Sequence, residues 1–188
     1  VCLFFPIVSE QTGDKFVVPR GLWCYRVDKS HVLVGGALTD GGSVVEWACS
    51  LMNLNTNDAF QECMEQVKDL ELEDMESPTL TVVPFLSGER STGYRNGAKG
   101  CVMGLTRETT CARFMKACLE GVTLRINAIL KLVCEAIGER MGDDEAKPYV
   151  VVSGNAMEKN DTWRQMLADA SGLETQLDSE ITEGSSRG

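Results

Sequence analysis

The glycine pair Gly41-Gly42 stands between an apolar run at 31–38 and a predicted helix at 43–52, a position suited to holding a phosphate group. Glycines let the backbone approach a bound group closely, and the following helix directs its free N–H groups and positive dipole end at the turn. The segment lacks the Gly-Lys-Ser/Thr of a Walker A loop and is not a clean dinucleotide fingerprint. From these residues alone, a structural turn is the simpler interpretation and phosphate binding is the alternative.

A second polar segment, the Ser-Gly-Glu-Arg-Ser loop at 87–91, follows a run of β-forming residues at 80–85. A glycine-marked turn at 100–104 then precedes a long predicted helix. Strand, polar loop, glycine turn and helix in this order suggest a site at the carboxyl edge of an open sheet. Taken by itself, the pair Glu89-Arg90 is most simply interpreted as an ion pair or a cap.

The pattern of apolar residues predicts one α/β domain with a mixed sheet covered by helices. Strands at 22–27 and 31–38 should form a hairpin, and the first five residues should form a further strand. The other predicted strands and helices lie at 43–52, 58–67, 80–85, about 108–140 and 149–152.

Two helix boundaries and one irregularity can also be predicted. Asn160 or Asp161 should cap the last helix, and Gly172 should end it. Gly121 would allow the long helix to bend or break. The stretch at 141–144 is expected to be a turn.

Composition excludes several classes of function. The net charge of −10 argues against a nucleic-acid partner, because phosphate neutralisation needs clustered lysine and arginine. No membrane span is expected, since no run of about 18 apolar residues occurs. The eight cysteines lack C-x-x-C spacing and His31 is the only histidine, so neither a zinc site nor a cysteine–histidine catalytic pair is expected. We interpret the cysteines as reduced, mostly buried thiols of a cytoplasmic protein, and the acidic run at 69–76 as a solvated loop or helix end.

Three stretches together resemble the C-terminal signature of the FGGY carbohydrate kinases. They are the loop at 87–91, the Gly-x-Val-x-Gly-Leu stretch at 100–105 and the Phe-x-x-Ala-x-Leu-Glu stretch that ends at Glu120. Arg113 and Cys118 depart from the usual residue types without disturbing the spacing. The resemblance implies an actin-like ATPase (ribonuclease H-like) fold. It also implies transfer of a phosphoryl group from ATP, with Mg²⁺, to a carbohydrate.

The resemblance further implies a nucleotide site built from two turns. In the first turn Gly42 approaches the phosphates, and Glu46 lies one helical turn further on. The second turn, at 153–156, resembles the family's adenosine turn, with Asn155 replacing the second glycine. Asn160 falls where a polar contact to the base is expected, and it can also be a helix N-cap. The residues expected to bind nucleotide are Gly41, Gly42, Glu46, Gly154, Asn155, Ala156 and Asn160.

The loop containing Glu89 and Arg90 lies beside the cleft between two lobes in this family, so the pair is expected to order the cleft or to contact the substrate. The catalytic aspartate, a further phosphate turn and most sugar contacts are expected upstream of Val1. The tail at 180–188 resembles the start of the family's last motif. We therefore expect residues 1–188 to be a single domain, the C-terminal lobe of a two-lobe sugar kinase, truncated at both ends and inactive alone. No catalytic residue and no metal ligand is assigned.

The expected partners are ATP or ADP and a sugar or sugar acid, the latter held mainly by the other lobe, and a homodimer is allowed. Among substrates, gluconate ranks first and xylulose second, because residues 21–26 and the Gly-Gly-Ser helix look closest to the gluconate-type kinases. Two alternatives stay open. One is a non-catalytic nucleotide-binding or protein-interaction domain of the same fold, which Asn155 favours. The other is an actin-like scaffold that forms filaments.

Overall fold

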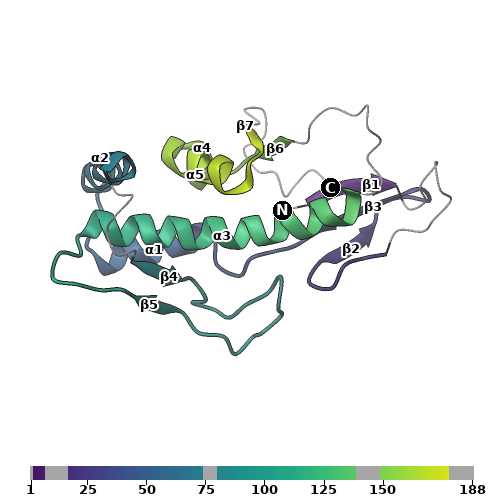
Figure 1. Cartoon of the computed structure of the whole chain (residues 1–188), viewed down its shortest axis with the longest axis horizontal. Helices are drawn as coiled ribbons and strands as arrows, with labels where there is room; N and C mark the ends of the chain where they lie inside the picture. The colour runs from purple at the N-terminus through teal and green to yellow at the C-terminus, as the bar shows by residue number, and fades with distance from the viewer. Residues whose placement is uncertain (1, 7–16, 74–79, 139–148, 178–188) are drawn as a thin grey trace.

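The computed structural model describes residues 2–6, 17–73, 80–138 and 149–177. The longest helix, α3 (Cys111–Gly138), runs along the length of the molecule, and the other elements are arranged around it (Figure 1). It contacts α1, α2, α5, β3 and β4. Helices α1 and α2 lie towards one end of α3, and strands β1 to β3 lie towards the other.

The first sheet is antiparallel and has the strand order β1-β3-β2. Its strands are β1 (Cys2–Pro6), β2 (Trp23–Arg26) and β3 (His31–Gly35). The predicted hairpin is confirmed, since β2 pairs directly with β3. Asp28 shapes its turn, because Oδ1 accepts hydrogen bonds from the backbone N–H groups of Ser30 (2.6 Å) and His31 (2.8 Å).

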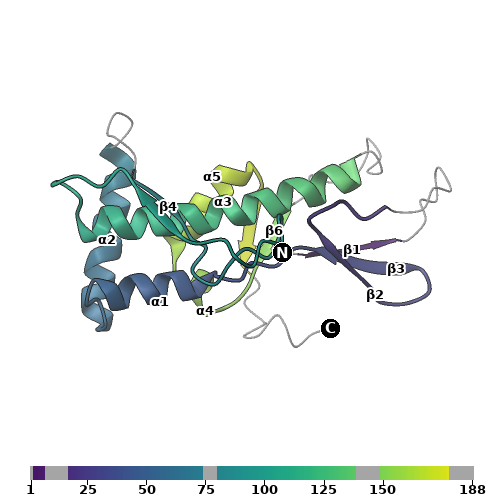
Figure 2. The same cartoon turned by 90° about the horizontal axis from the view of Figure 1, so that it is seen from below.

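Helices α1 (Gly42–Leu51) and α2 (Asn57–Glu73) confirm the two helices predicted next, although α2 is longer than predicted and ends within the acidic run. Each presents one apolar face to α3, and α2 crosses the end of α3 (Figure 2). The buried apolar residues of these faces are Val44, Ala48, Cys63, Met64 and Val67.

Strands β4 (Thr81–Val83) and β5 (Cys101–Met103) form an antiparallel pair of their own. The loop at 84–100 therefore joins two antiparallel strands, and its predicted place at the carboxyl edge of an open sheet is wrong. Strand β5 was not predicted, because its three residues lie in a glycine-marked stretch that is typical of a turn.

Helix α3 is continuous, so no break occurs near Gly121. The glycine serves packing instead: a Cβ at this position would collide with the carbonyl oxygen of Val82 in β4. The helix begins after Thr110, whose Oγ1 accepts a hydrogen bond from the N–H of Arg113 (3.2 Å).

The last described elements are β6 (Tyr149–Val152), α4 (Asn155–Glu158), α5 (Asp161–Ser171) and β7 (Glu174–Leu177). Asn160 caps α5, since its Oδ1 accepts a hydrogen bond from the N–H of Trp163 (2.9 Å). Gly172 ends the helix in the left-handed conformation, with φ of 68°. Both predicted boundaries are confirmed. The Trp163 indole N–H donates to Thr123 Oγ1 (3.0 Å) and so ties α5 to α3.

The predicted α/β class is confirmed, but a single mixed sheet is not present among the described residues. Strands β6 and β7 pair in parallel, whereas the other two sheets are antiparallel, and the three sheets remain separate. The predicted turn at 141–144 and the tail beyond 177 lie outside the described residues.

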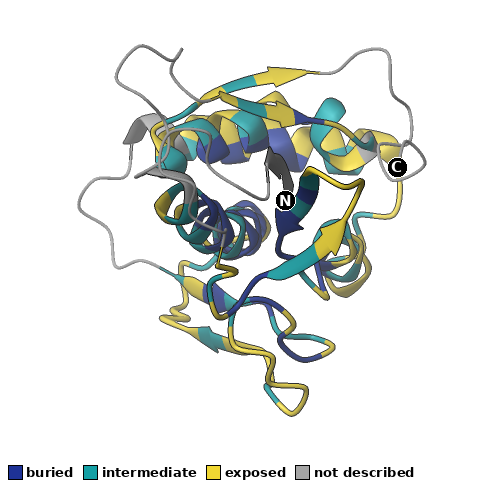
Figure 3. Cartoon of the chain, turned by 90° about the vertical axis from the view of Figure 1, so that its right-hand side faces the viewer, coloured by how far each residue is buried: buried dark blue, intermediate teal, exposed yellow. Residues whose placement is uncertain are grey.

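The core lies where the helices meet, and Figure 3 shows helices with buried and exposed faces. Cys63 and Cys118 belong to this core, as predicted. Cys101 and Cys111 are exposed and Cys24, Cys49 and Cys134 are partly buried, so the expectation of mostly buried thiols is wrong for these five. Burial raises the pKa of Cys63 to about 11 and that of Cys118 to about 12, so both thiols stay protonated at neutral pH. None of the helices in the described part of the chain is long and apolar enough to cross a membrane.

The close approach of α3 to β4 makes a prediction. Gly121→Ala should lower the free energy of unfolding by about 2 kcal/mol, because the added methyl group meets a backbone oxygen that cannot move aside alone. Leu124→Ala, on the exposed face of the same helix, should change it by less than about 0.5 kcal/mol. Urea unfolding measures both changes in free energy. Equal effects of the two substitutions would show that the close approach of Gly121 to β4 does not constrain the packing of α3.

Candidate functional site

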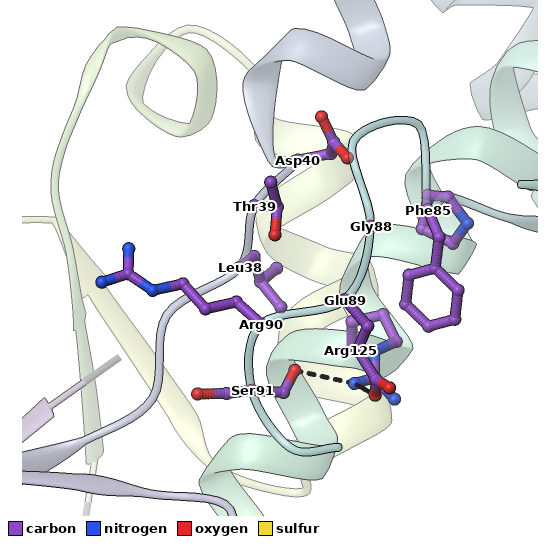
Figure 4. Close-up of a pocket in the computed structure, with 10 residues that line it drawn as sticks. Leu38, Thr39, Asp40, Phe85, Gly88, Glu89, Arg90, Ser91 and Arg125 are labelled. Atoms are coloured by element: carbon purple, nitrogen blue, oxygen red, sulfur yellow. Dashed lines mark hydrogen bonds and ion pairs between the residues drawn. The ribbon is translucent and has the colours of Figure 1, made fainter. Parts of the chain in front are cut away.

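The turn after β3 and the loop after β4 border one small, open hollow (Figure 4). Residues 38–40 contribute from the turn, and residues 84–85 and 88–91 contribute from the loop. Arg125 of α3 completes the lining. The structure thus brings the glycine pair predicted to bind phosphate close to the Glu89-Arg90 loop.

An ion pair attaches this loop to α3. Arg125 Nη2 donates hydrogen bonds to Glu89 Oε1 (2.6 Å) and to the carbonyl oxygen of Ser91 (2.8 Å). The guanidinium carbon also lies 5.1 Å from the centre of the Phe85 ring, a cation–π distance. Only 8% of the Glu89 side chain is exposed, so water screens this pair less than it screens a surface pair.

Two glycines allow the loop to close around the Glu89 carboxylate. Gly88 has φ of 91°, and a Cβ there would stand 2.6 Å from the carbonyl oxygen of Asn96. A Cβ on Gly93 would collide with the Glu89 carboxylate, and the Gly93 N–H donates to Glu89 Oε1 (3.3 Å). The conformation of the 87–93 loop is therefore fixed by contacts within the loop itself, around the Glu89 carboxylate.

Glu89 and Arg90 consequently differ in what they can bind. The Glu89 carboxylate is occupied by Arg125 and by the Gly93 N–H. Arg90 is exposed, and its side chain extends away from Glu89 (Figure 4). Of the two predicted residues, Arg90 is the one whose side chain can reach a ligand.

Sequence reasoning missed two residues of this hollow, Asp40 and Arg125. Asp40 is 8% exposed, and its Oδ2 accepts a hydrogen bond from the backbone N–H of Ser87 (2.7 Å). An aspartate before the glycine pair that starts a helix is a recognisable capping signal. Arg125 carries no such signal, because its partner lies in a distant loop.

The two turns expected to bind nucleotide lie side by side. A Cβ on Gly42 would stand 3.3 Å from the Cβ of Ala156, closer than an ordinary van der Waals contact. A Cβ on Gly41 would meet nothing within 4 Å, so the backbone there borders open space. The N-cap residue of α1 is Gly41, which has no side chain to cap the helix, and this favours the N–H groups of the first turn as donors to an anionic ligand.

The second turn depends on Gly154, whose φ of 101° favours glycine. Its N–H donates to Glu158 Oε1 (2.7 Å), which closes the turn onto α4. Asn155, the departure from the family pattern, is the first residue of α4, and Ala156 is exposed beside Gly42.

The remaining predicted residues lie at the edges of this junction. Glu46 is exposed on α1, one turn after Gly42. Asn160 is 8% exposed, and its carboxamide caps α5 and lies 4.0 Å from Met64 Sδ. No group of three or more metal-ligating side chains that could hold a metal ion occurs in residues 2–6, 17–73, 80–138 and 149–177.

The fold matches solved structures of carbohydrate kinases. The Plasmodium falciparum glycerol kinase structure with ADP superposes with a TM-score of 0.72 and covers 97% of this chain and 34% of its own, at 20% identity. The Lactobacillus acidophilus gluconate kinase gives a TM-score of 0.67, covering 94% of this chain and 32% of its own, at 23% identity. At these identities the likeness defines the fold class, that of actin-like ATPase domains.

Sequence comparison defines the family. Residues 15–188 match the C-terminal domain of the FGGY family of carbohydrate kinases, and the chain belongs to this family. Gluconokinase from Bacillus licheniformis is 24% identical over 176 residues, which cover 87% of this chain and 31% of the relative. Xylulose kinase from Escherichia coli K12 is 30% identical over 150 residues, which cover 80% of this chain and 28% of the relative. The chain thus spans less than a third of the length of these relatives.

The buried ion pair makes a prediction. In a double-mutant cycle of Arg125→Met and Glu89→Gln, the coupling should be about 2 kcal/mol, because the pair is shielded from solvent. The more exposed pair of Lys116 and Glu120 on the same helix should give about 0.4 kcal/mol. Urea unfolding measures both cycles, and a coupling below about 0.5 kcal/mol at Arg125 would contradict a structural role for the pair.

Proposed function

We propose that this chain is the ATP-binding lobe of a two-lobe carbohydrate kinase, which transfers the γ-phosphate of ATP to a hydroxyl of a sugar or sugar acid. The proximity of Gly42 to Ala156 carries the proposal, because it brings together the two turns that the family resemblance assigns to the phosphates and to the adenosine. Membership of the FGGY family supports the same chemistry.

The phosphates would lie at Gly41-Gly42, where the backbone borders open space. The N–H groups and the positive dipole end of α1 would stabilise their charge. Adenosine would lie along 154–156, where Gly154 turns the chain. Glu46 would border the phosphates from the next turn of α1. Asn160 would serve the site chiefly by fixing the start of α5 behind the base.

Magnesium accompanies ATP in this chemistry and neutralises charge on the transferred phosphoryl group. The described residues contain no cluster suited to a metal ion, so its ligands would be phosphate oxygens, water and groups of the other lobe. The catalytic aspartate would also come from outside residues 1–188. Closure of the two lobes would bring the γ-phosphate to the sugar.

The substrate is proposed as gluconate first and xylulose second. Relatives of both activities match the chain, as the Bacillus licheniformis gluconokinase and the Escherichia coli xylulose kinase show by their names. Arg90 supports an acidic substrate, because its exposed guanidinium borders the hollow and can pair with a carboxylate. The cysteines at 24, 49, 63, 101, 111, 118 and 134 are free thiols, which fits a cytoplasmic protein.

One alternative is supported by a particular residue. Asn155 replaces the second glycine of the adenosine turn, and its added side chain would favour a non-catalytic domain if it crowded the base. Measurements of nucleotide binding and of sugar phosphorylation distinguish the non-catalytic domain from the kinase lobe proposed first.

The nucleotide site makes a prediction for binding. Calorimetry should detect Mg·ADP binding to the 188-residue chain, and Gly42→Val should weaken it by about tenfold or more, because the side chain fills the space beside Ala156. Gly97→Ala is the matched control: it changes a loop glycine with no heavy atom within 4 Å of an added Cβ, and should leave the affinity unchanged. Equal affinities for wild type and Gly42→Val would place the nucleotide elsewhere.

The proposed function also makes a prediction for catalysis. The chain alone should bind nucleotide without phosphorylating a sugar. A protein that joins it to an N-terminal lobe should release ADP faster with gluconate than with xylulose in a coupled assay. A two-lobe protein that binds Mg·ADP but phosphorylates neither sugar nor glycerol would favour the non-catalytic alternative.

A further inference from the structure

Asp40 links two segments that are far apart in the sequence. Its carboxylate is 8% exposed and accepts the backbone N–H of Ser87, 47 positions along the chain, at 2.7 Å. The other oxygen accepts a longer hydrogen bond from the Ser43 hydroxyl in the first turn of α1 (3.5 Å). A buried carboxylate needs such donors, because burial without them is costly. Neither bond involves a cation, so Asp40 acts through its position as an acceptor.

Ser91 makes a second connection between the same two segments. Its backbone N–H donates to the carbonyl oxygen of Ala37 (3.0 Å), and its Oγ accepts the Ala37 N–H (3.1 Å). Arg125 then fixes the carbonyl of Ser91 to α3. The loop is therefore anchored at its Ser91 end without Asp40. At its Ser87 end, the hydrogen bond to Asp40 ties the loop to the residue that precedes Gly41-Gly42.

We propose that Asp40 is a positioning residue, which holds the Gly41-Gly42 turn against the Ser87 end of the loop so that the turn is preformed for phosphate. The proposal rests on the proposed function, since it assigns the nucleotide to this turn. Asp40 contributes a hydrogen-bond acceptor and no bond to the ligand. Its negative charge is not required for this task, because a neutral amide oxygen can accept the same N–H.

The distinction between acceptor and charge gives the test. Asp40→Ala removes the acceptor, and Asp40→Asn keeps an acceptor while removing the charge. Asp69→Ala removes the same charge from the exposed surface of α2 and is the control. Calorimetry with Mg·ADP should show binding about tenfold weaker for Asp40→Ala, and within about threefold of wild type for Asp40→Asn and Asp69→Ala.

Amide hydrogen exchange without nucleotide tests the link independently of binding. In Asp40→Ala the N–H groups of Ser87 and of Val44, which donates to the Gly41 carbonyl oxygen (3.0 Å), should exchange at least about tenfold faster, while the core of α3 stays protected and shows that the variant is folded. Asp40→Asn should restore slow exchange at both positions. If Asp40→Ala does not fold, Asp40→Asn tests the proposal by itself. An exchange rate and an affinity near those of wild type would show that the hydrogen-bond acceptor at position 40 is sufficient and that its charge is not needed.

Two results would overturn the proposal. One is Asp40→Ala with wild-type exchange at Val44 and Ser87, which would show that the link does not hold the turn. The other is Asp40→Asn as impaired as Asp40→Ala, which would show that the charge acts directly. Failure of the proposed function gives a different result: the wild-type chain would bind no Mg·ADP, while the exchange rates of the variants would still decide the role of Asp40.

Discussion

The close packing of α3 on β4 is the constraint on which the site depends. Gly121 has no side chain, and this lets the helix approach the backbone of Val82. Arg125 lies four residues further along α3, on the same face of the helix. The approach at Gly121 therefore brings the Arg125 guanidinium within hydrogen-bond distance of Glu89 and of the Ser91 carbonyl. A bulkier residue at 121 would move the helix and withdraw the cation from the loop.

Beyond the bonds of Arg125 to the Glu89 loop, hydrogen bonds between loops hold the rest of the site together. The loop around Glu89 is closed by Gly88 and Gly93, and it is joined to the segment after β3 through Asp40 and Ser91. The same segment leads into α1, whose first residue lies beside the turn at Ala156. Elements from the first, middle and last parts of the chain thus meet in one region, which fits a domain that binds a ligand at loops on a rigid scaffold.

Local signals predicted the regular elements well. Periodic apolar residues indicated α1, α2 and α3, and the capping residues Asn160 and Gly172 gave both ends of α5. Strands β5 and β7 were missed, because segments of three or four residues carry little periodicity. Gly121 was interpreted as a weak point in a helix, since the sequence does not show that a strand lies against it.

The residues of the candidate site likewise fall into those that the sequence predicted and those that it did not. The family resemblance gave the two glycine turns and the Glu89-Arg90 loop from contiguous motifs, and the structure places the two turns together. It could not give the partners of Glu89 or Ser87, because Arg125 lies 36 positions from Glu89 and Asp40 lies 47 positions from Ser87. Such pairs are determined by the tertiary packing of α3 and by the course of the loops, which no local pattern encodes.

The central claim is that Gly41-Gly42 and the turn at 154–156 form one nucleotide site, and an amide NMR titration of the chain with Mg·ADP tests it most directly. The account predicts saturable shifts confined to residues of about 35–47 and 153–163, in a well-dispersed spectrum of a folded chain. Shifts centred on another surface, or none at millimolar Mg·ADP, would contradict it.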